Sequence, residues 1–211
     1  MTKNHAAVIL AGGAGQRMGG VDKPLALLHG HPLITHVIET IMPQTDQIAI
    51  AGRTNPDAYR QFGLPILPDQ QAYRGPISGI LSAILWARLQ NPTATHVLIA
   101  PGDTPFLPED LLSRLVERNP KPSQVVIAAS QSRAHYTIGL WPLAAEPLLR
   151  AALEQDSPPP LASIAEDLSM IEVVWRSQIG DDPFFNINTK EALELAELRL
   201  TLAPRTRRGA R

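Results

Sequence analysis

Short apolar runs alternate along the chain with segments whose apolar residues recur at helical spacing. The runs typical of buried strands cover residues 6–10, 47–51, 66–68, 96–100, 124–130, 137–141 and 170–175. The segments expected to be helical cover residues 32–41, 55–62, 77–90, 108–118, 144–153, 161–168 and 188–200. This alternation predicts an α/β fold with a mainly parallel sheet and helices on both faces.

Two of the expected helices carry further signals. The segment 77–90 predicts one apolar helix face made of Ile77, Ile80, Leu81, Ile84, Leu85 and Leu89. At the start of the last helix, Asn188 and Glu191 have the spacing of a capping pair. Asn188 is therefore a candidate N-cap of that helix, a role that competes with binding but is compatible with it.

Composition narrows the function classes. The 211 residues carry 19 Lys and Arg against 20 Asp and Glu, so no broad attraction to nucleic acid or an anionic membrane is expected. The absence of cysteine excludes a disulfide scaffold, an iron–sulfur cluster, a cysteine-based zinc site and a cysteine nucleophile. No apolar run approaches the roughly 20 residues of a membrane span. We expect one cytoplasmic domain over residues 1–204, and a basic, disordered tail over 205–211.

Ligands of such sheets bind beyond the carboxyl ends of the strands, and the loop after the first strand is rich in glycine. It holds two cations, Arg17 and Lys23, and five glycines within nine residues: Gly12, Gly13, Gly15, Gly19 and Gly20. Glycines let backbone N–H groups turn toward an anion, and the cations can hold a polyphosphate. The loop therefore favours a nucleoside triphosphate, with a merely flexible turn as the alternative.

Two common phosphate-binding loops do not fit this segment. Counted from Gly13, the third glycine of a dinucleotide fingerprint falls on Met18, which disfavours a nicotinamide-dependent dehydrogenase. A Walker A loop needs Lys followed by Ser or Thr, whereas Pro24 follows Lys23.

A second unusual loop follows the strand over residues 96–100 and contains Asp103. A carboxylate at a strand's carboxyl end, on the same edge as the glycine-rich loop, is well placed to hold Mg²⁺ together with substrate phosphates. The alternative is an aspartate that bonds its own backbone in a turn.

The string LAGGAGQRMGGVDK, from Leu10 to Lys23, resembles the signature of the molybdenum cofactor guanylyltransferases, the bacterial MobA family of nucleotidyltransferases. That signature is leucine-alanine-glycine-glycine, a variable stretch, arginine-methionine-glycine-glycine, one variable residue and aspartate-lysine. Relatives that transfer CMP or UMP more often have alanine where Gly12 stands. The resemblance covers residues 6–200 and implies a Rossmann-like nucleotidyltransferase fold.

The resemblance also implies roles for single residues. The residues implied in catalysis are Lys23, Asp103 and Arg17, with Asp103 as the Mg²⁺ ligand. The residues implied in nucleotide binding are Leu10, Ala11, Gly12, Gly13, Gly15, Lys23, Asp69, Gly79 and Asp103. The residues implied on the pterin side of the cleft are His135, Asn186 and Asn188, although a lone histidine is more often structural or exposed.

Two positions depart from the family's pattern. Tyr136 stands where the family often has proline between histidine and threonine. Arg53 follows Gly52 where the family commonly has an asparagine near the nucleotide, so that contact is not carried over.

The implied reaction transfers GMP from GTP to the terminal phosphate of the molybdenum–molybdopterin cofactor and releases pyrophosphate. The resemblance also implies transient contacts with cofactor-biosynthesis proteins and apo-molybdoenzymes. The alternatives are a cytidylyltransferase on the same cofactor, a guanylyltransferase on another phosphate, and a non-catalytic GTP-binding regulator or carrier of the cofactor.

Overall fold

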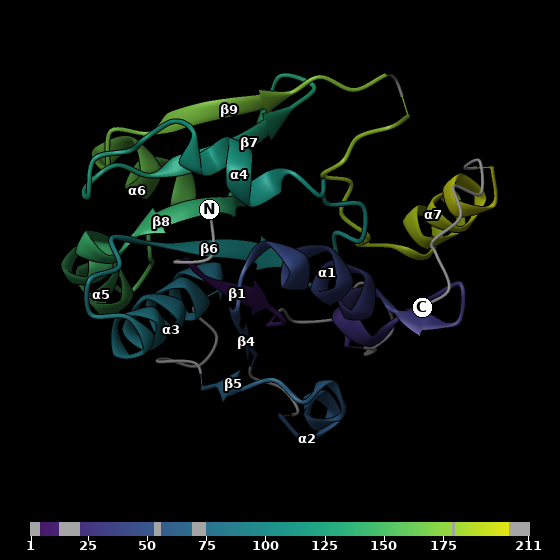
Figure 1. The fold of residues 1–211 in the computed structure, drawn as a ribbon, viewed down its shortest axis with the longest axis horizontal. Helices are drawn as coiled ribbons and strands as arrows, with labels where there is room; N and C mark the ends of the chain where they lie inside the picture. The colour runs from purple at the N-terminus through teal and green to yellow at the C-terminus, as the bar shows by residue number, and fades with distance from the viewer. Residues whose placement is uncertain (1–4, 13–21, 53–55, 69–74, 179, 203–211) are drawn as a thin grey trace.

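A seven-stranded sheet forms the centre of the molecule (Figure 1). The computed structural model describes residues 5–12, 22–52, 56–68, 75–178 and 180–202. In spatial order the strands are β5 (Ile66–Leu67), β4 (Gln47–Ala51), β1 (Ala6–Leu10), β6 (His96–Pro101), β8 (Arg133–Pro142), β7 (Val126–Ser130) and β9 (Ile171–Trp175). Only β8 runs antiparallel to its neighbours β6 and β7. The predicted α/β fold with a mainly parallel sheet is confirmed.

Helices cover both faces of this sheet. On one face α3 (Gly75–Gln90), α5 (Glu146–Glu154) and α6 (Leu161–Asp167) share a core with side chains such as Val8 and Ile127. On the other face α1 (Leu33–Ile41) and α4 (Leu111–Val116) pack on side chains such as Ile9 and Leu98. Because neighbouring residues of a strand point to opposite faces, a wholly apolar strand such as β1 serves both cores.

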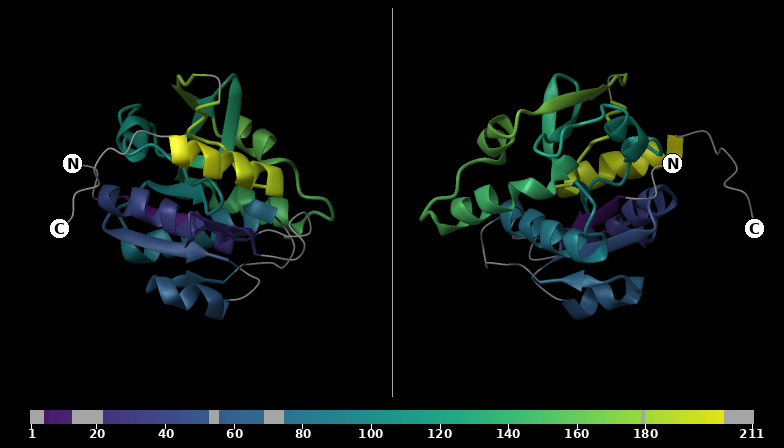
Figure 2. Two further views of the ribbon diagram at one scale, coloured as in Figure 1. Left: turned by 90° about the vertical axis from the view of Figure 1, so that its right-hand side faces the viewer. Right: turned by 60° about the vertical axis from the view of Figure 1, so that its left-hand side comes forward.

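Two smaller parts complete the fold. A short helix, α2 (Pro56–Tyr59), lies near the edge strand β5, and α7 (Lys190–Leu202) contacts β2 (Leu27–Leu28) of a small hairpin closed by β3 (His31–Pro32). Figure 2 (left) shows α7 lying across the end of the sheet.

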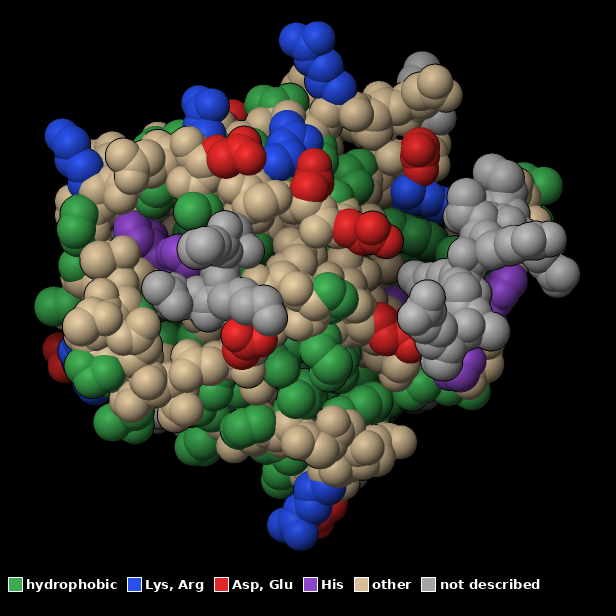
Figure 3. All heavy atoms as spheres, viewed as in Figure 1, with side chains coloured by type: hydrophobic (Ala, Val, Ile, Leu, Met, Phe, Trp, Pro, Cys, Tyr) green, Lys and Arg blue, Asp and Glu red, His purple; other side chains and the backbone are tan. Residues whose placement is uncertain are grey.

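On the face seen in Figure 3, several Lys and Arg side chains are separated by Asp and Glu.

The structure corrects three expectations about helices. Leu89 is 80% exposed, and the buried part of α3 includes Ser78, Ser82 and Ala83, so α3 is buried nearly all round rather than along one face. Helix α4 begins at Leu111, after a turn. The last helix is capped by Thr189, whose Oγ1 accepts a hydrogen bond from the Ala192 N–H at 3.1 Å, and not by Asn188.

Strand β8 begins earlier than the apolar pattern predicts, because its first residues, 133–136, are only partly buried or exposed. Its pairing with β7 shifts register beside Ile127, which lies opposite Gly139. A Cβ atom on Gly139 would lie 2.2 Å from the Val126 carbonyl oxygen. Glycine is therefore required where the two strands come closest.

We predict that Gly139→Ala lowers the free energy of unfolding by about 2 kcal/mol or more, because the added methyl meets backbone that cannot move independently. The matched control is Gly79→Ala, whose Cβ would meet only the tip of the Leu10 side chain at 2.9 Å. Urea unfolding of both variants tests this. An equal loss in the two variants would contradict the prediction.

Candidate active site

The carboxyl ends of β1 and β6 lie side by side because these strands are parallel neighbours. Leu10 and Pro101 are register partners, and the Gly102 N–H donates to the Leu10 carbonyl oxygen at 2.9 Å. A Cβ on Gly102 would lie 3.2 Å from Cβ of Pro24, so glycine lets the two loops approach closely. The expectation that both loops share one edge of the sheet is confirmed.

Asp103 lies at this junction and is held from two sides. Its Oδ1 accepts a hydrogen bond from Asn186 Nδ2 at 2.8 Å, and its carbonyl oxygen accepts one from the Ile187 N–H at 2.9 Å. Burial raises the pKa of Asp103 to about 6, although the nearby Lys23 charge and the Asn186 hydrogen bond act in the opposite direction. The protein thus keeps a desolvated carboxylate whose charge is only partly compensated.

Lys23, whose charge acts on Asp103, lies in a single turn of 3₁₀ helix over Lys23–Leu25. Its Nζ donates to Asn188 Oδ1 at 2.8 Å. The segment before α7 therefore gives one asparagine to each charged residue. Sequence reasoning assigned both asparagines to the pterin side and did not foresee these contacts, which join residues far apart in the chain.

A cavity of about 160 Å³ lies between these groups. The residues that line it include Leu10, Gly12, Lys23, Asp103 and Asn186. The structure thus brings together four of the residues predicted to bind the nucleotide. The cavity is the meeting point of a cation, a carboxylate and exposed backbone at Gly12.

Other predicted site residues lie elsewhere or outside the described part of the chain. Ala11 is buried, and its N–H donates to the Ala51 carbonyl oxygen at 2.7 Å. Gly79 is buried against the Leu10 side chain. Their roles in nucleotide binding stay predictions. The predicted residues outside the described ranges are Gly13, Gly15, Arg17 and Asp69, together with Arg53.

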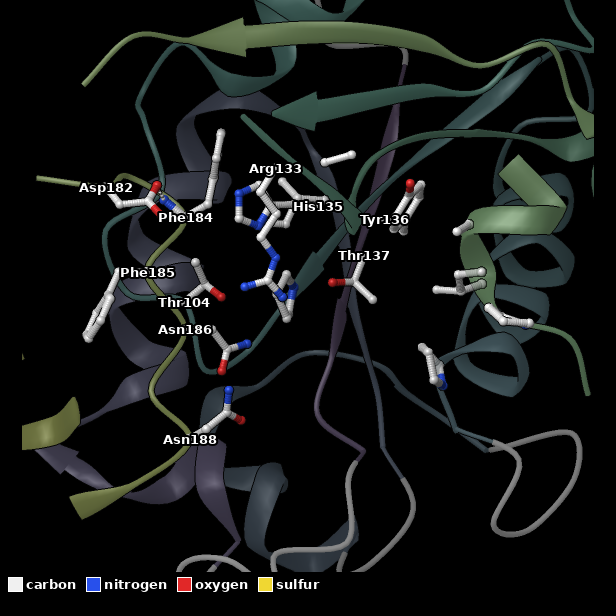
Figure 4. A pocket seen from close by; sticks show the side chains of 17 residues that line it. Thr104, Arg133, His135, Tyr136, Thr137, Asp182, Phe184, Phe185, Asn186 and Asn188 are labelled. Atoms are coloured by element: carbon white, nitrogen blue, oxygen red, sulfur yellow. Dashed lines mark hydrogen bonds between the residues drawn. The ribbon is translucent and has the colours of Figure 1, made fainter. Parts of the chain in front are cut away.

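A wider cavity of about 570 Å³ adjoins the first, with Pro76, Pro101, Asn186 and Thr137 common to both. Figure 4 shows Asn186 and Asn188 on one chain segment, with His135, Arg133 and Thr137 presented from β8. The predicted pterin-side residues thus line one cavity. Its volume lies within the 300–1,000 Å³ typical of small-molecule sites.

Sequence reasoning missed a buried pair beside Lys23. The Tyr59 hydroxyl hydrogen-bonds the Asp22 carboxyl, and it also lies 3.5 Å from the Ala11 carbonyl oxygen. Burial raises the pKa of both groups, and the proximity of Asp22 adds to the shift of Tyr59. This pair links α2 to both ends of the glycine-rich loop. The Asp22-Lys23-Pro24 motif was a visible signal, whereas nothing in the sequence around Tyr59 marked it.

Two further observations concern the described residues alone. Nowhere in these ranges do three or more His, Cys, Asp or Glu side chains gather as metal ligands. No helix within them is long and apolar enough to cross a membrane.

The chain is similar to known nucleotidyltransferases over most of its length. Residues 7–169 match the family model of the MobA-like NTP transferase domain. A molybdenum cofactor guanylyltransferase of Acidiphilium cryptum is 38% identical over 192 residues, which is 90% of this chain and 93% of the relative. One from Rhodopseudomonas palustris is 39% identical and covers 90% and 91% of the two chains.

Solved structures give the same fold. Molybdopterin-guanine dinucleotide biosynthesis protein A from Archaeoglobus fulgidus superposes with a TM-score of 0.72 at 23% identity, over 93% of this chain and 98% of the other. At that identity the match supports the fold alone.

Because the pKa of Asp103 is raised, we predict that Asp103→Asn increases the free energy of unfolding in a pH-dependent way. In the fold this carboxyl titrates near 6 instead of 3.8, so its ionisation costs stability as pH rises through that window. The metal-free variant should exceed the wild type by up to about 3 kcal/mol in free energy of unfolding at about pH 8. At about pH 4 the variant and the wild type should have equal free energies of unfolding. Urea unfolding at both pH values tests this, and a pH-independent difference would contradict it.

Proposed function

The chain belongs to the molybdenum cofactor guanylyltransferases, and on that premise we propose that it transfers GMP from GTP to the terminal phosphate of molybdenum–molybdopterin, with release of pyrophosphate. The observation that carries the proposal is that Lys23 and Asp103 line one small cavity at the ends of β1 and β6. A triphosphate needs cations, and its divalent ion needs a carboxylate.

The residues present fit a magnesium ion. Asp103 offers a carboxylate, and the Oδ1 atom of the adjacent Asn186 is buried without a hydrogen-bond partner among the described residues. Both are hard oxygen ligands, and Mg²⁺ takes its remaining ligands from phosphates and water. When bound, the ion would neutralise phosphate charge as a Lewis acid.

The protein's own part in the reaction is positioning and charge neutralisation. The attacking phosphate is already ionised and needs no strong general base, so the main barrier is bringing two anions together. Lys23, oriented by Asn188, offsets the charge that grows on the departing pyrophosphate. The sequence adds Arg17 to this role, and Gly13 and Gly15 as N–H donors. Asp69 is expected to contact the nucleotide.

The two adjoining cavities suit the two substrates. The smaller one, with Leu10 and exposed Gly12 at its rim, is proposed for the nucleotide, and the larger one for the pterin. Both reach Asn186, so the reacting phosphates would meet near Asp103. Protein partners that supply or receive the molybdenum cofactor belong to this proposal as transient contacts.

We expect Lys23→Ala to lower turnover by about 10²- to 10³-fold with the fold intact, because it removes a cation at the developing charge. Pyrophosphate release, measured with GTP, Mg²⁺ and molybdenum–molybdopterin, tests this. Lys190→Ala, an exposed change on α7, is the matched control and should stay at the wild-type rate. Near wild-type turnover in Lys23→Ala would remove Lys23 from the mechanism.

We also expect a strong preference for GTP over CTP. A site whose buried groups pair with guanine leaves them unpaired with another base, and each unmade bond costs about 1–3 kcal/mol. Supplying each of the four nucleoside triphosphates with Mg²⁺ and the pterin cofactor tests this. A preference for CTP would assign the chain to cytidylyl transfer. Nucleotide binding without pyrophosphate release would support a regulator or carrier instead.

A further inference from the structure

Three side chains, of which Ser130 is buried and the other two are partly buried, form a hydrogen-bonded chain at the wall of the larger cavity. Ser130 ends β7, His135 lies in β8, and Asp182 lies in the segment after β9. The Ser130 Oγ is 2.8 Å from His135 Nε2 and 2.7 Å from Asp182 Oδ1. The same Asp182 oxygen accepts the Phe184 N–H at 2.9 Å.

The protons of this chain can be assigned from its chemistry. A carboxylate oxygen accepts hydrogen bonds, so the one hydroxyl proton of Ser130 points to Asp182. The Ser130 oxygen can then only accept from the histidine, so His135 Nε2 carries a proton. In the neutral ring, Nδ1 is left with a free lone pair.

The order of contacts also excludes a serine nucleophile here. In a hydrolytic triad, histidine lies between serine and aspartate and takes the hydroxyl proton. Here Ser130 lies between the other two and gives its proton to Asp182. The chain therefore serves to fix the imidazole ring.

The surroundings keep that ring neutral and in place. Burial and the nearby Arg133 charge lower the pKa of His135, against the opposing effect of Asp182. Its ring packs against Phe184, with the centroids 5.0 Å apart. Among the described residues, no hydrogen bond occupies Nδ1, and His135 lines the larger cavity.

We propose that His135 presents Nδ1 as a fixed hydrogen-bond acceptor to the second substrate, and that Ser130 and Asp182 are positioning residues that set this tautomer. The ligand chemistry is that of a flat heterocycle with ring or exocyclic N–H donors, which a pterin provides. This inference rests on the proposed function, because it names what the larger cavity recognises.

The first test observes the protonation of the His135 ring directly and does not depend on enzymatic activity. In ¹⁵N spectra of the imidazole nitrogens, His135 is identified among the six histidines as the signal missing from His135→Asn. At about pH 7.5 the wild type should show a single Nε2–H tautomer. Ser130→Ala should give a mixture of tautomers. A wild-type ring that carries its proton on Nδ1, or on both nitrogens, would overturn the proposal.

The second test uses isosteric substitutions. The amide of Asn can place an oxygen near the position of Nδ1, whereas the amide of Gln reaches the position of Nε2 and leaves no acceptor at Nδ1. We expect His135→Gln to raise KM for the pterin substrate about tenfold, as one buried donor loses its partner. His135→Asn should retain most of the wild-type KM, and KM for GTP and kcat should change little in both.

The control is His31→Gln, an exposed histidine of the small hairpin, which should match the wild type. Equal behaviour of His135→Gln and the wild type would overturn the proposal while leaving GMP transfer intact. A wild-type enzyme that releases no pyrophosphate would instead refute the proposed function. The tautomer measurement still tests the positioning role in that case.

Discussion

The site depends on the parallel pairing of β1 with β6. This pairing ends both strands at the same height, and the hydrogen bond from Gly102 to Leu10 holds their loops together. Gly12 and Lys23, near the two ends of the glycine-rich loop, then line one cavity with Asp103, which lies far away in the chain. Without this pairing, the cation at Lys23 and the carboxylate at Asp103 would have no common ligand.

The segment before α7 contributes the remaining side-chain contacts of the site. It first lines the wider cavity, where Asp182 anchors its start through Ser130, and then contacts Asp103 and Lys23 through Asn186 and Asn188. The loop after β6 thus supplies the carboxylate and β8 supplies the histidine, while one irregular segment contacts both. Asn186 lines both cavities, which suits a reaction that joins two substrates through phosphate.

The sequence predicted the parts of the site that follow from local pattern. Apolar strands followed by Gly12 and by Asp103 were visible, because chain direction and loop position are local properties. The capping role expected of Asn188 was wrong, because its amide oxygen accepts from Lys23, 165 residues away, and Thr189 takes the cap. Tyr59, Ser130 and Asp182 were missed for the same reason: their partners come from other elements, and no motif marks them.

The two asparagines have an energetic consequence for loading the enzyme. Within the described residues, the ammonium of Lys23 and the carboxylate of Asp103 are each held by a neutral amide and not by a direct ion pair with one another. Breaking a buried ion pair costs several kcal/mol, whereas exchanging an amide contact costs far less. An anion that binds to Lys23 therefore has no direct ion pair with Asp103 to break. Little of its binding free energy is lost in displacing the amide contact.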